Sequence, residues 1–201
     1  MTSSSSARRV GPYDILHSKP IYENPWIKVR EDRVAWRGGV EQVFGVVTIR
    51  AGVSLLPMEE EGDVYLVREF KYGIGEETLE VISGAIESGE NPEHAGLREL
   101  AEECGLVASE WVDMGVVNPF TTVVNSPNHL FLARKLSKLS RMPEVLAPAR
   151  QGGQAGDRVS VVKMPFEEAY RAVLRGQITH AASCVLILKT REYLERRGKG
   201  S

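Results

Sequence analysis

The carboxylates of one short segment are the residues of this chain best suited to chemistry. From position 84 to position 106 the sequence reads GAIESGENPEHAGLRELAEECGL. Asn91 and Pro92 are residue types that begin helices and Gly105 is a type that ends them, so a helix is predicted between these positions. Its apolar residues recur at helical spacing and are expected to form one buried stripe, made by Leu97, Leu100, Ala101 and Cys104.

The glutamates of this predicted helix lie off that stripe. Glu99 and Glu103 are four residues apart, so their carboxylates are neighbours and their repulsion costs roughly a few tenths of a kcal/mol. A bound divalent cation would reverse the sign of that interaction, and hard oxygen ligands suit Mg²⁺, Mn²⁺ or Ca²⁺. Arg98 can neutralise an acid of the preceding loop, such as Glu90. The alternative interpretation is a solvated acidic helix face that binds nothing.

The complete pattern resembles the signature of the Nudix hydrolases. All of its constrained positions match, namely Gly84, Glu90, Arg98, Glu99, Leu100, Glu102, Glu103, Gly105 and Leu106. The resemblance implies a strand–loop–helix unit in an α/β/α sandwich with a mixed sheet. It also implies hydrolysis of a nucleoside diphosphate linked to another moiety, with Mg²⁺ or Mn²⁺ as cofactor. Glu99, Glu103 and the backbone carbonyl of Ser83 are then the expected metal ligands, and Glu102 is expected to assist catalysis.

The flanking sequence resembles the ADP-ribose and nucleotide-sugar pyrophosphatase branch of that family. The resemblance is carried by VYLVREFKYGIGEETLEVISGAIESGE and runs, more weakly, from about residue 26 to about residue 188. The branch implies a homodimer whose N-terminal sheets complete each other's sites. By position, Trp26 and Phe44 are expected to stack on adenine, or else to pack in the core or the dimer interface. Glu80 is expected to hydrogen-bond the substrate, and Lys71 replaces an arginine that contacts the phosphate or ribose.

The chain departs from this branch before the loop glycine and in a later loop. Ile82 and Ser83 replace the usual Pro-Ala, although the Ser83 carbonyl can still bind a metal ion. The loop NPFTTVVNSPN contains no acid, whereas such enzymes often carry a catalytic glutamate there. Asp157 is therefore the first candidate for the general base, unless it is an ordinary turn residue. Glu144 and the signature residue Glu102 are further candidates.

Two histidines are left out of the expected site. His129 and His180 are each isolated in the sequence, and a lone histidine is more often a packed or exposed residue than a general base.

Composition and charge argue against several other classes of protein. The chain has 201 residues, a net charge of −2 and 42% hydrophobic residues, which is typical of a globular protein without a nucleic-acid partner. No apolar run is long enough to span a membrane. The two cysteines, Cys104 and Cys184, are too few for a disulfide framework. A cytoplasmic protein without a membrane or nucleic-acid partner is expected.

Strand, helix and turn signals predict an α/β or α+β fold in several parts. Residues 1–10 are expected to be a disordered leader and residues 11–50 a small N-terminal antiparallel β-sheet, to which the resemblance assigns dimerisation. Residues 51–196 are expected to form the Nudix hydrolase domain, and residues 197–201 a disordered tail. Residues 137–157 are rich in Pro, Gly, Ala and Ser and are expected to form a lid or to be disordered.

The first expectation for the function is metal-dependent hydrolysis of ADP-ribose or a related nucleoside diphosphate sugar. The products would be a nucleoside monophosphate and a sugar phosphate. One alternative is a different substrate, such as a GDP- or UDP-sugar, a dinucleoside polyphosphate or a damaged nucleotide. Another is a non-catalytic sensor of ADP-ribose, which the missing loop glutamate favours and the intact set of signature carboxylates opposes.

Overall fold

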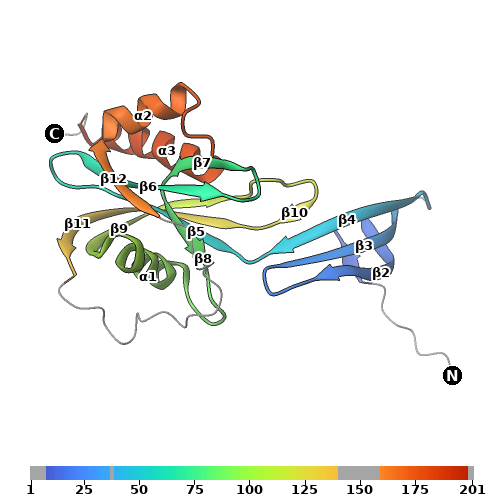
Figure 1. Cartoon of the computed structure of the whole chain (residues 1–201). Helices are drawn as coiled ribbons and strands as arrows, with labels where there is room; N and C mark the ends of the chain where they lie inside the picture. The colour runs from blue at the N-terminus through green and yellow to red at the C-terminus, as the bar shows by residue number, and fades with distance from the viewer. Residues whose placement is uncertain (1–7, 37–38, 140–158, 199–201) are drawn as a thin grey trace. The chain divides into compact units, whose positions relative to one another are not determined.

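The computed structural model describes residues 8–36, 39–139 and 159–198, and its elements are labelled in Figure 1. The contacts between residues divide the chain into two compact units. One contains the described residues up to Arg50 together with Asn118–Ser126, and the other contains the remaining described residues. Within the described residues, no helix is both long enough and apolar enough to cross a membrane.

The first unit is a five-stranded sheet of order β1-β2-β3-β4-β10. Its strands are β1 (Arg9–Val10), β2 (Tyr13–Glu23), β3 (Ile27–Trp36), β4 (Glu41–Ile49) and β10 (Val124–Asn125). The first four strands pair in antiparallel fashion, as the alternating sequence predicts, whereas β10 pairs parallel to β4. The short strand β10 lies in the loop NPFTTVVNSPN, which the sequence does not assign to this sheet.

The start of this unit differs from the expected disordered leader. The sequence predicts no structure up to position 10, but Arg9 and Val10 pair with Asp14 and Tyr13 as strand β1. The Arg9 guanidinium also lies 3.5 Å from a carboxylate oxygen of Asp14. Backbone pairing across a tight turn therefore orders this stretch, which has no apolar pattern of its own.

The second unit contains two sheets. The mixed sheet has the order β8-β5-β11-β9 and is formed by β5 (Gly52–Pro57), β8 (Ile82–Ala85), β9 (Leu106–Val117) and β11 (Asn128–Lys138). Strands β5 and β11 are parallel, and the other neighbours are antiparallel. An antiparallel sheet of order β12-β6-β7 is formed by β6 (Asp63–Lys71), β7 (Glu76–Glu80) and β12 (Ser160–Pro165).

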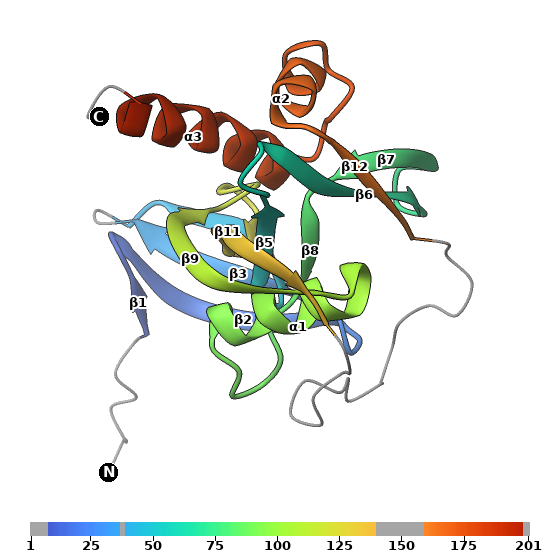
Figure 2. The ribbon, with the colours of Figure 1, turned by 90° about the vertical axis from the view of Figure 1, so that its left-hand side faces the viewer.

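Helices cover both faces of the mixed sheet, as Figure 2 shows. Helix α1 (Pro92–Cys104) covers one face and α3 (Ala181–Gly198) the other, whereas α2 (Phe166–Leu174) packs against α3 and the strands β12 and β6. Alternation along β5 explains the layers, because Leu55 packs in the core beneath α1 whereas Leu56 packs in the core beneath α2 and α3. The predicted α/β/α sandwich with a mixed sheet is thus confirmed. Helix α3 continues to Gly198, into the tail that the sequence predicts to be disordered.

Helix α1 begins and ends where the sequence predicts. The Asn91 side chain accepts a hydrogen bond from the His94 backbone at 2.8 Å, and Pro92 occupies the first helical position. Gly105 ends the helix with φ of 62°, a left-handed conformation that favours glycine.

The buried face of α1 is broader than the predicted stripe. Its buried residues are Ala95, Gly96, Glu99, Leu100 and Ala101. Leu97 and Cys104 are only half-buried, whereas Glu99, which the helical pattern places off the stripe, is 8% exposed. The packing of α1 against β8 and β5 turns the Glu99 side of the helix inward.

Candidate active site

Strand β8, the loop of residues 86–91 and helix α1 form the strand–loop–helix unit that carries the signature carboxylates. Arg98 joins its three parts. The guanidinium donates to the Ala85 carbonyl at 2.9 Å, to both Glu90 carboxylate oxygens at 3.1 Å, and to Glu99 Oε1 at 2.6 Å. The expected contact between Arg98 and Glu90 is therefore present. Glu90 also accepts from the Glu87 backbone at 3.0 Å, which holds the turn of the loop.

Gly84 leaves the space that the Glu99 side chain occupies. A Cβ atom at position 84 would lie 1.9 Å from Glu99 Oε1, a separation that no carbon and oxygen in contact can adopt. Because Arg98 fixes the same carboxylate from the other side, the side chain cannot move away without losing that ion pair. Position 84 therefore needs glycine for a close approach of side chain to backbone.

Burial disfavours the charged forms of two signature carboxylates. Burial raises the pKa of Glu99 to about 7, although the Arg98 cation opposes the rise. Burial likewise raises the pKa of Glu103 to about 8, with the negative charges of Glu99 and Glu69 adding to the effect. The neighbouring Lys71 cation lowers it in part. Acidic side chains are thus grouped in a buried environment, where their charged forms are poorly solvated.

One carboxylate oxygen of this pair makes no hydrogen bond within the described part of the chain. Glu103 Oε2 is buried and has no hydrogen-bond partner among the described residues. A buried acceptor left in this state costs about 1–3 kcal/mol, more if it is charged. A divalent cation would satisfy it, and carboxylate oxygens are the donors that Mg²⁺ and Mn²⁺ prefer. The residues present therefore fit a hard divalent cation.

The remaining donors for such an ion would have to come from outside the acidic side chains. In the part of the chain that the structure describes, no three His, Cys, Asp or Glu side chains are grouped so that they could hold a metal ion. The Ser83 hydroxyl is engaged with Ser54 Oγ at 2.9 Å and donates to the Val81 carbonyl at 3.2 Å. Two carboxylates, a backbone carbonyl and water form a donor set typical of Mg²⁺, which keeps several of its waters.

Glu102 lies beside this pair on the same helix. Its Oε1 is 3.6 Å from Arg98 Nη1, so the cation that holds Glu99 also faces Glu102. Three of the four signature glutamates, Glu90, Glu99 and Glu102, therefore share one guanidinium, and Glu103 follows Glu102 on the helix.

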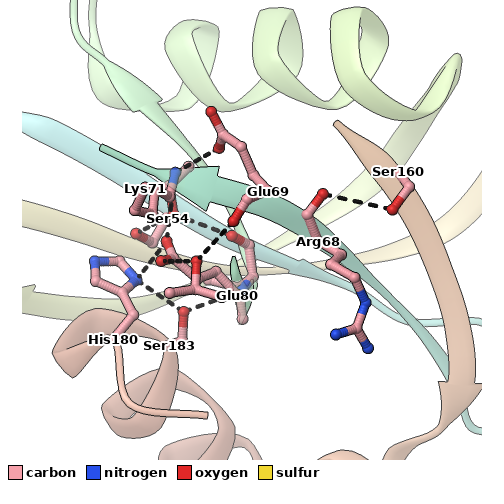
Figure 3. Close-up of polar contacts among 11 residues, drawn as sticks. Ser54, Arg68, Glu69, Lys71, Glu80, Ser160, His180 and Ser183 are labelled. Atoms are coloured by element: carbon pink, nitrogen blue, oxygen red, sulfur yellow. Dashed lines mark hydrogen bonds and ion pairs between the residues drawn. The ribbon is translucent and has the colours of Figure 1, made fainter. Parts of the chain in front are cut away.

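Lys71 and Glu80, both expected in the substrate site, lie near each other in the second unit. Lys71 Nζ is 3.8 Å from Glu80 Oε2 and 2.5 Å from Glu69 Oε2 (Figure 3). Glu80 is buried and accepts a hydrogen bond from Thr78 Oγ1 at 2.7 Å. It is thus not a solvated charge on an edge strand.

The sequence reasoning does not identify two residues of this cluster. Glu69 stands two positions before Lys71 on β6, so the period-two alternation of a strand is a signal that places both on one face. His180 is absent from the expected site, yet its Nδ1 lies 3.3 Å from Glu80 Oε2. No local pattern could have revealed it, because Glu80 and His180 are a hundred positions apart in the sequence.

The other expected site residues belong to the first unit or lie outside the described residues. Trp26 and Phe44 belong to the first unit, where Trp26 is 55% exposed and the Phe44 ring lies 5.3 Å from that of Tyr13. Asp157 and Glu144 lie outside the described residues, as does most of the 137–157 segment.

The close approach at Gly84 leads to a prediction about metal binding. Gly84→Ala should displace the Glu99 carboxylate and weaken Mn²⁺ binding by about tenfold or more, because an oxygen that is expected to bind the metal ion moves out of place. Isothermal titration calorimetry with Mn²⁺ measures the change. Gly45→Ala is the control, since its added Cβ meets no atom within 4 Å and its affinity should match that of the wild type. Equal affinities for all three proteins would contradict the assignment of Glu99 as a ligand.

The raised pKa values of Glu99 and Glu103 predict how stability depends on pH when chelator is present. Both folded-state pKa values exceed the ordinary glutamate value of 4.5, so between about pH 5 and pH 8 the folded state binds more protons than the unfolded state. The free energy of unfolding contributed by these groups is therefore largest at low pH and is lost as the pH rises through this range.

Urea unfolding in EDTA at a series of pH values measures this dependence. The double variant Glu99→Gln, Glu103→Gln should lose less stability between pH 5 and pH 8 than the wild type, and saturating Mg²⁺ should reduce the wild-type loss. Parallel curves for the wild type and the double variant would contradict the prediction.

Comparisons with known proteins agree with this geometry. The NUDIX domain model matches residues 48–181, and the model of the nucleoside diphosphate sugar hydrolase N-terminal domain matches residues 14–47. An ADP-ribose pyrophosphatase of Bacillus subtilis (strain 168) is 26% identical over 182 residues, which cover 90% of this chain and 94% of the relative. An ADP-ribose pyrophosphatase of Mycobacterium tuberculosis (strain ATCC 25618 / H37Rv) is 26% identical over 180 residues, covering 88% and 82% of the two chains.

A solved structure and the family model agree on the fold. The crystal structure of an ADP compounds hydrolase superposes with a TM-score of 0.78 at 21% identity, covering 95% of this chain and 98% of that one. The NUDIX model spans well over half of the present chain and includes both β8 and α1. This protein therefore belongs to the Nudix family.

Proposed function

We propose that this protein hydrolyses the pyrophosphate bond of ADP-ribose or a related nucleoside diphosphate sugar, using Mg²⁺ or Mn²⁺. The observation that carries the proposal is the buried pair of Glu99 and Glu103, in which Glu103 Oε2 has no hydrogen-bond partner among the described residues. Such a pair is destabilising unless a cation binds it, and the complete Nudix signature surrounds it. The products are a nucleoside monophosphate and a sugar phosphate.

The residues of the strand–loop–helix unit have separate roles in this proposal. Glu99, Glu103 and the Ser83 carbonyl hold the cation, and Arg98 orients Glu99. When bound, the cation supplies charge stabilisation to the diphosphate and lowers the pKa of a coordinated water. Glu102 assists proton transfer from its place beside Arg98.

The proposed substrate contacts involve four side chains. Lys71 faces the phosphate or ribose as a point charge, and Glu80 accepts a hydrogen bond from the substrate. Trp26 and Phe44 are proposed to stack on the adenine, and the exposed indole of Trp26 is available for such a contact. Asp157 is retained as the proposed general base. The named activities of the two bacterial relatives, both ADP-ribose pyrophosphatases, support this choice of substrate class.

A cytoplasmic homodimer is also proposed, with residues 11–50 as the dimerisation region. The first unit exposes large apolar side chains on β2 and β4, including Leu16, Ile21, Tyr22 and Val43, which are between 50% and 61% exposed. Exposed apolar side chains of this size are the kind that a protein interface covers.

Light scattering coupled to size-exclusion chromatography tests the dimer. The wild type should have twice the mass of the chain, and Ile21→Lys should shift it toward the mass of one chain, because an ammonium would be buried without a partner. Val161→Lys is the matched control, since Val161 is 43% exposed on β12 in the second unit. A monomeric wild type would overturn the dimer and leave the proposed hydrolysis standing.

The substrate proposal is tested by turnover of a panel with Mg²⁺ or Mn²⁺. The panel contains ADP-ribose, GDP-mannose, UDP-glucose, diadenosine polyphosphates and nucleoside triphosphates, and release of phosphatase-sensitive products measures hydrolysis. ADP-ribose should have the highest kcat/KM. Preference for GDP-mannose or UDP-glucose would retain the metal chemistry and discard adenine stacking by Trp26 and Phe44. Tight binding of ADP-ribose without turnover would instead show a sensor, a function that the loop without a glutamate favours.

The metal-ligand role of Glu103 predicts a sharp loss of activity. Glu103→Gln should lower kcat by about 100-fold or more, because a neutral amide is a poor ligand for a hard cation. Urea unfolding should show a fold at least as stable as the wild type, since the buried like charge is removed. Glu192→Gln, an exposed glutamate of α3, should keep full activity. Full activity of Glu103→Gln would remove the residue from the ligand set.

A further inference from the structure

The carboxylate of Glu80 has two candidate donors for one of its oxygens. Its Oε1 accepts from Thr78 Oγ1 at 2.7 Å. Its Oε2 faces His180 Nδ1 at 3.3 Å and Lys71 Nζ at 3.8 Å, as Figure 3 shows. Since the Glu80 side chain is only 9% exposed, little water is available to replace either donor.

Lys71 is shared between two acids but lies nearer to one of them. Its Nζ is 2.5 Å from Glu69 Oε2 and 3.8 Å from Glu80 Oε2. A lysine ammonium carries three donors on a flexible stem, so it can move between carboxylates with little cost in geometry. The charges of Glu69 and Lys71 both act on Glu103, which places this pair within electrostatic reach of the proposed metal ligands.

His180 is fixed by contacts that do not involve the substrate. Its Nδ1 lies 2.9 Å from Ser183 Oγ, and this buried hydroxyl accepts a hydrogen bond from the Val81 backbone at 3.0 Å. Val81 follows Glu80 in the chain, so the imidazole is tied to the same stretch that carries the carboxylate. An ionised carboxylate only accepts hydrogen bonds, so the imidazole can donate to Glu80 only in the tautomer with the proton on Nδ1, where Ser183 Oγ and Glu80 Oε2 share that proton.

The two donors compete for Glu80 Oε2. In the tautomer with the proton on Nδ1, the imidazole donates to this oxygen, so Glu80 needs no second donor and the ammonium stays with Glu69. Without the imidazole, a buried carboxylate oxygen would lose a donor, which is unfavourable in a site with little water. The Lys71 ammonium lies near enough to replace the imidazole as the donor to Glu80. Its movement toward Glu80 would break its ion pair with Glu69.

We propose that His180 is a positioning residue, which donates to Glu80 and thereby keeps the Lys71 ammonium on Glu69, beside the signature carboxylates. In that place the ammonium faces the phosphate or ribose of the substrate, a consequence that rests on the function proposed above. The imidazole itself need not touch the substrate. Only a hydrogen-bond donor at position 180 can hold Glu80 in this way. Another residue with an N–H group at the same place should therefore also keep Lys71 on Glu69.

The first test is a crystal structure of His180→Ala. Lys71 Nζ should move to hydrogen-bond distance of Glu80 Oε2, about 3 Å, and leave Glu69. In His180→Gln, whose amide can donate to Glu80, and in the control His129→Gln, Lys71 should remain on Glu69. Lys71 should also remain there in the double variant Glu80→Gln, His180→Ala, because the neutral amide no longer attracts the ammonium. An ammonium that stays on Glu69 in His180→Ala overturns the proposal.

The second test is a double-mutant cycle on the kinetics with ADP-ribose. His180→Ala should raise KM by about tenfold and change kcat by less than about twofold, and His180→Gln should restore most of the loss. In a Lys71→Met background, His180→Ala should change KM by less than about twofold, because the residue through which it acts is gone. Additive losses in the cycle would overturn the proposal.

The two tests separate this inference from the proposed function. If the wild type turns over no member of the substrate panel, the proposed function fails. The crystal structures still decide whether His180 keeps Lys71 on Glu69, since that readout needs neither substrate nor metal.

Discussion

A single guanidinium organises the candidate active site. Arg98 is largely buried and binds a carbonyl of β8, a carboxylate of the loop and a carboxylate of its own helix. A buried cation needs such partners, and each partner needs the cation, so the loop conformation and the position of Glu99 are determined together. The place of Glu103, one turn further along α1, follows from that of Glu99.

The surrounding core allows this charged arrangement to persist. Leu100 and Ala95 bury α1 against the mixed sheet, and the opposite face of that sheet is covered by α3. Apolar packing on both faces holds the carboxylates close together despite their repulsion. Apolar packing in the core therefore offsets the free energy that the repulsion between the carboxylates costs, as is common at functional sites.

Local signals account for the parts of the site that could be predicted, and long-range packing accounts for those that could not. Asn91, Pro92 and Gly105 are helix-boundary residues whose effect depends on their immediate neighbours, so the bounds of α1 follow from the sequence. The burial of Glu99 depends on β8, and the contact of His180 with Glu80 depends on how the start of α3 packs beside the end of β7. Neither leaves a periodic pattern, and the same is true of the pairing of β10 with β4.

The path of the chain between the two units has a consequence for how the protein could be divided. The backbone passes from one unit to the other after Arg50, again after Val117 and a third time after Ser126. A truncation that removed the N-terminal strands would leave β10 without β4, the strand with which it pairs, while β9 and β11 would still be joined by the segment that carries it. The N-terminal sheet therefore cannot be removed without affecting the rest of the chain. A shortened chain beginning at residue 51 would keep β10, without its pairing partner, in the segment that connects β9 to β11.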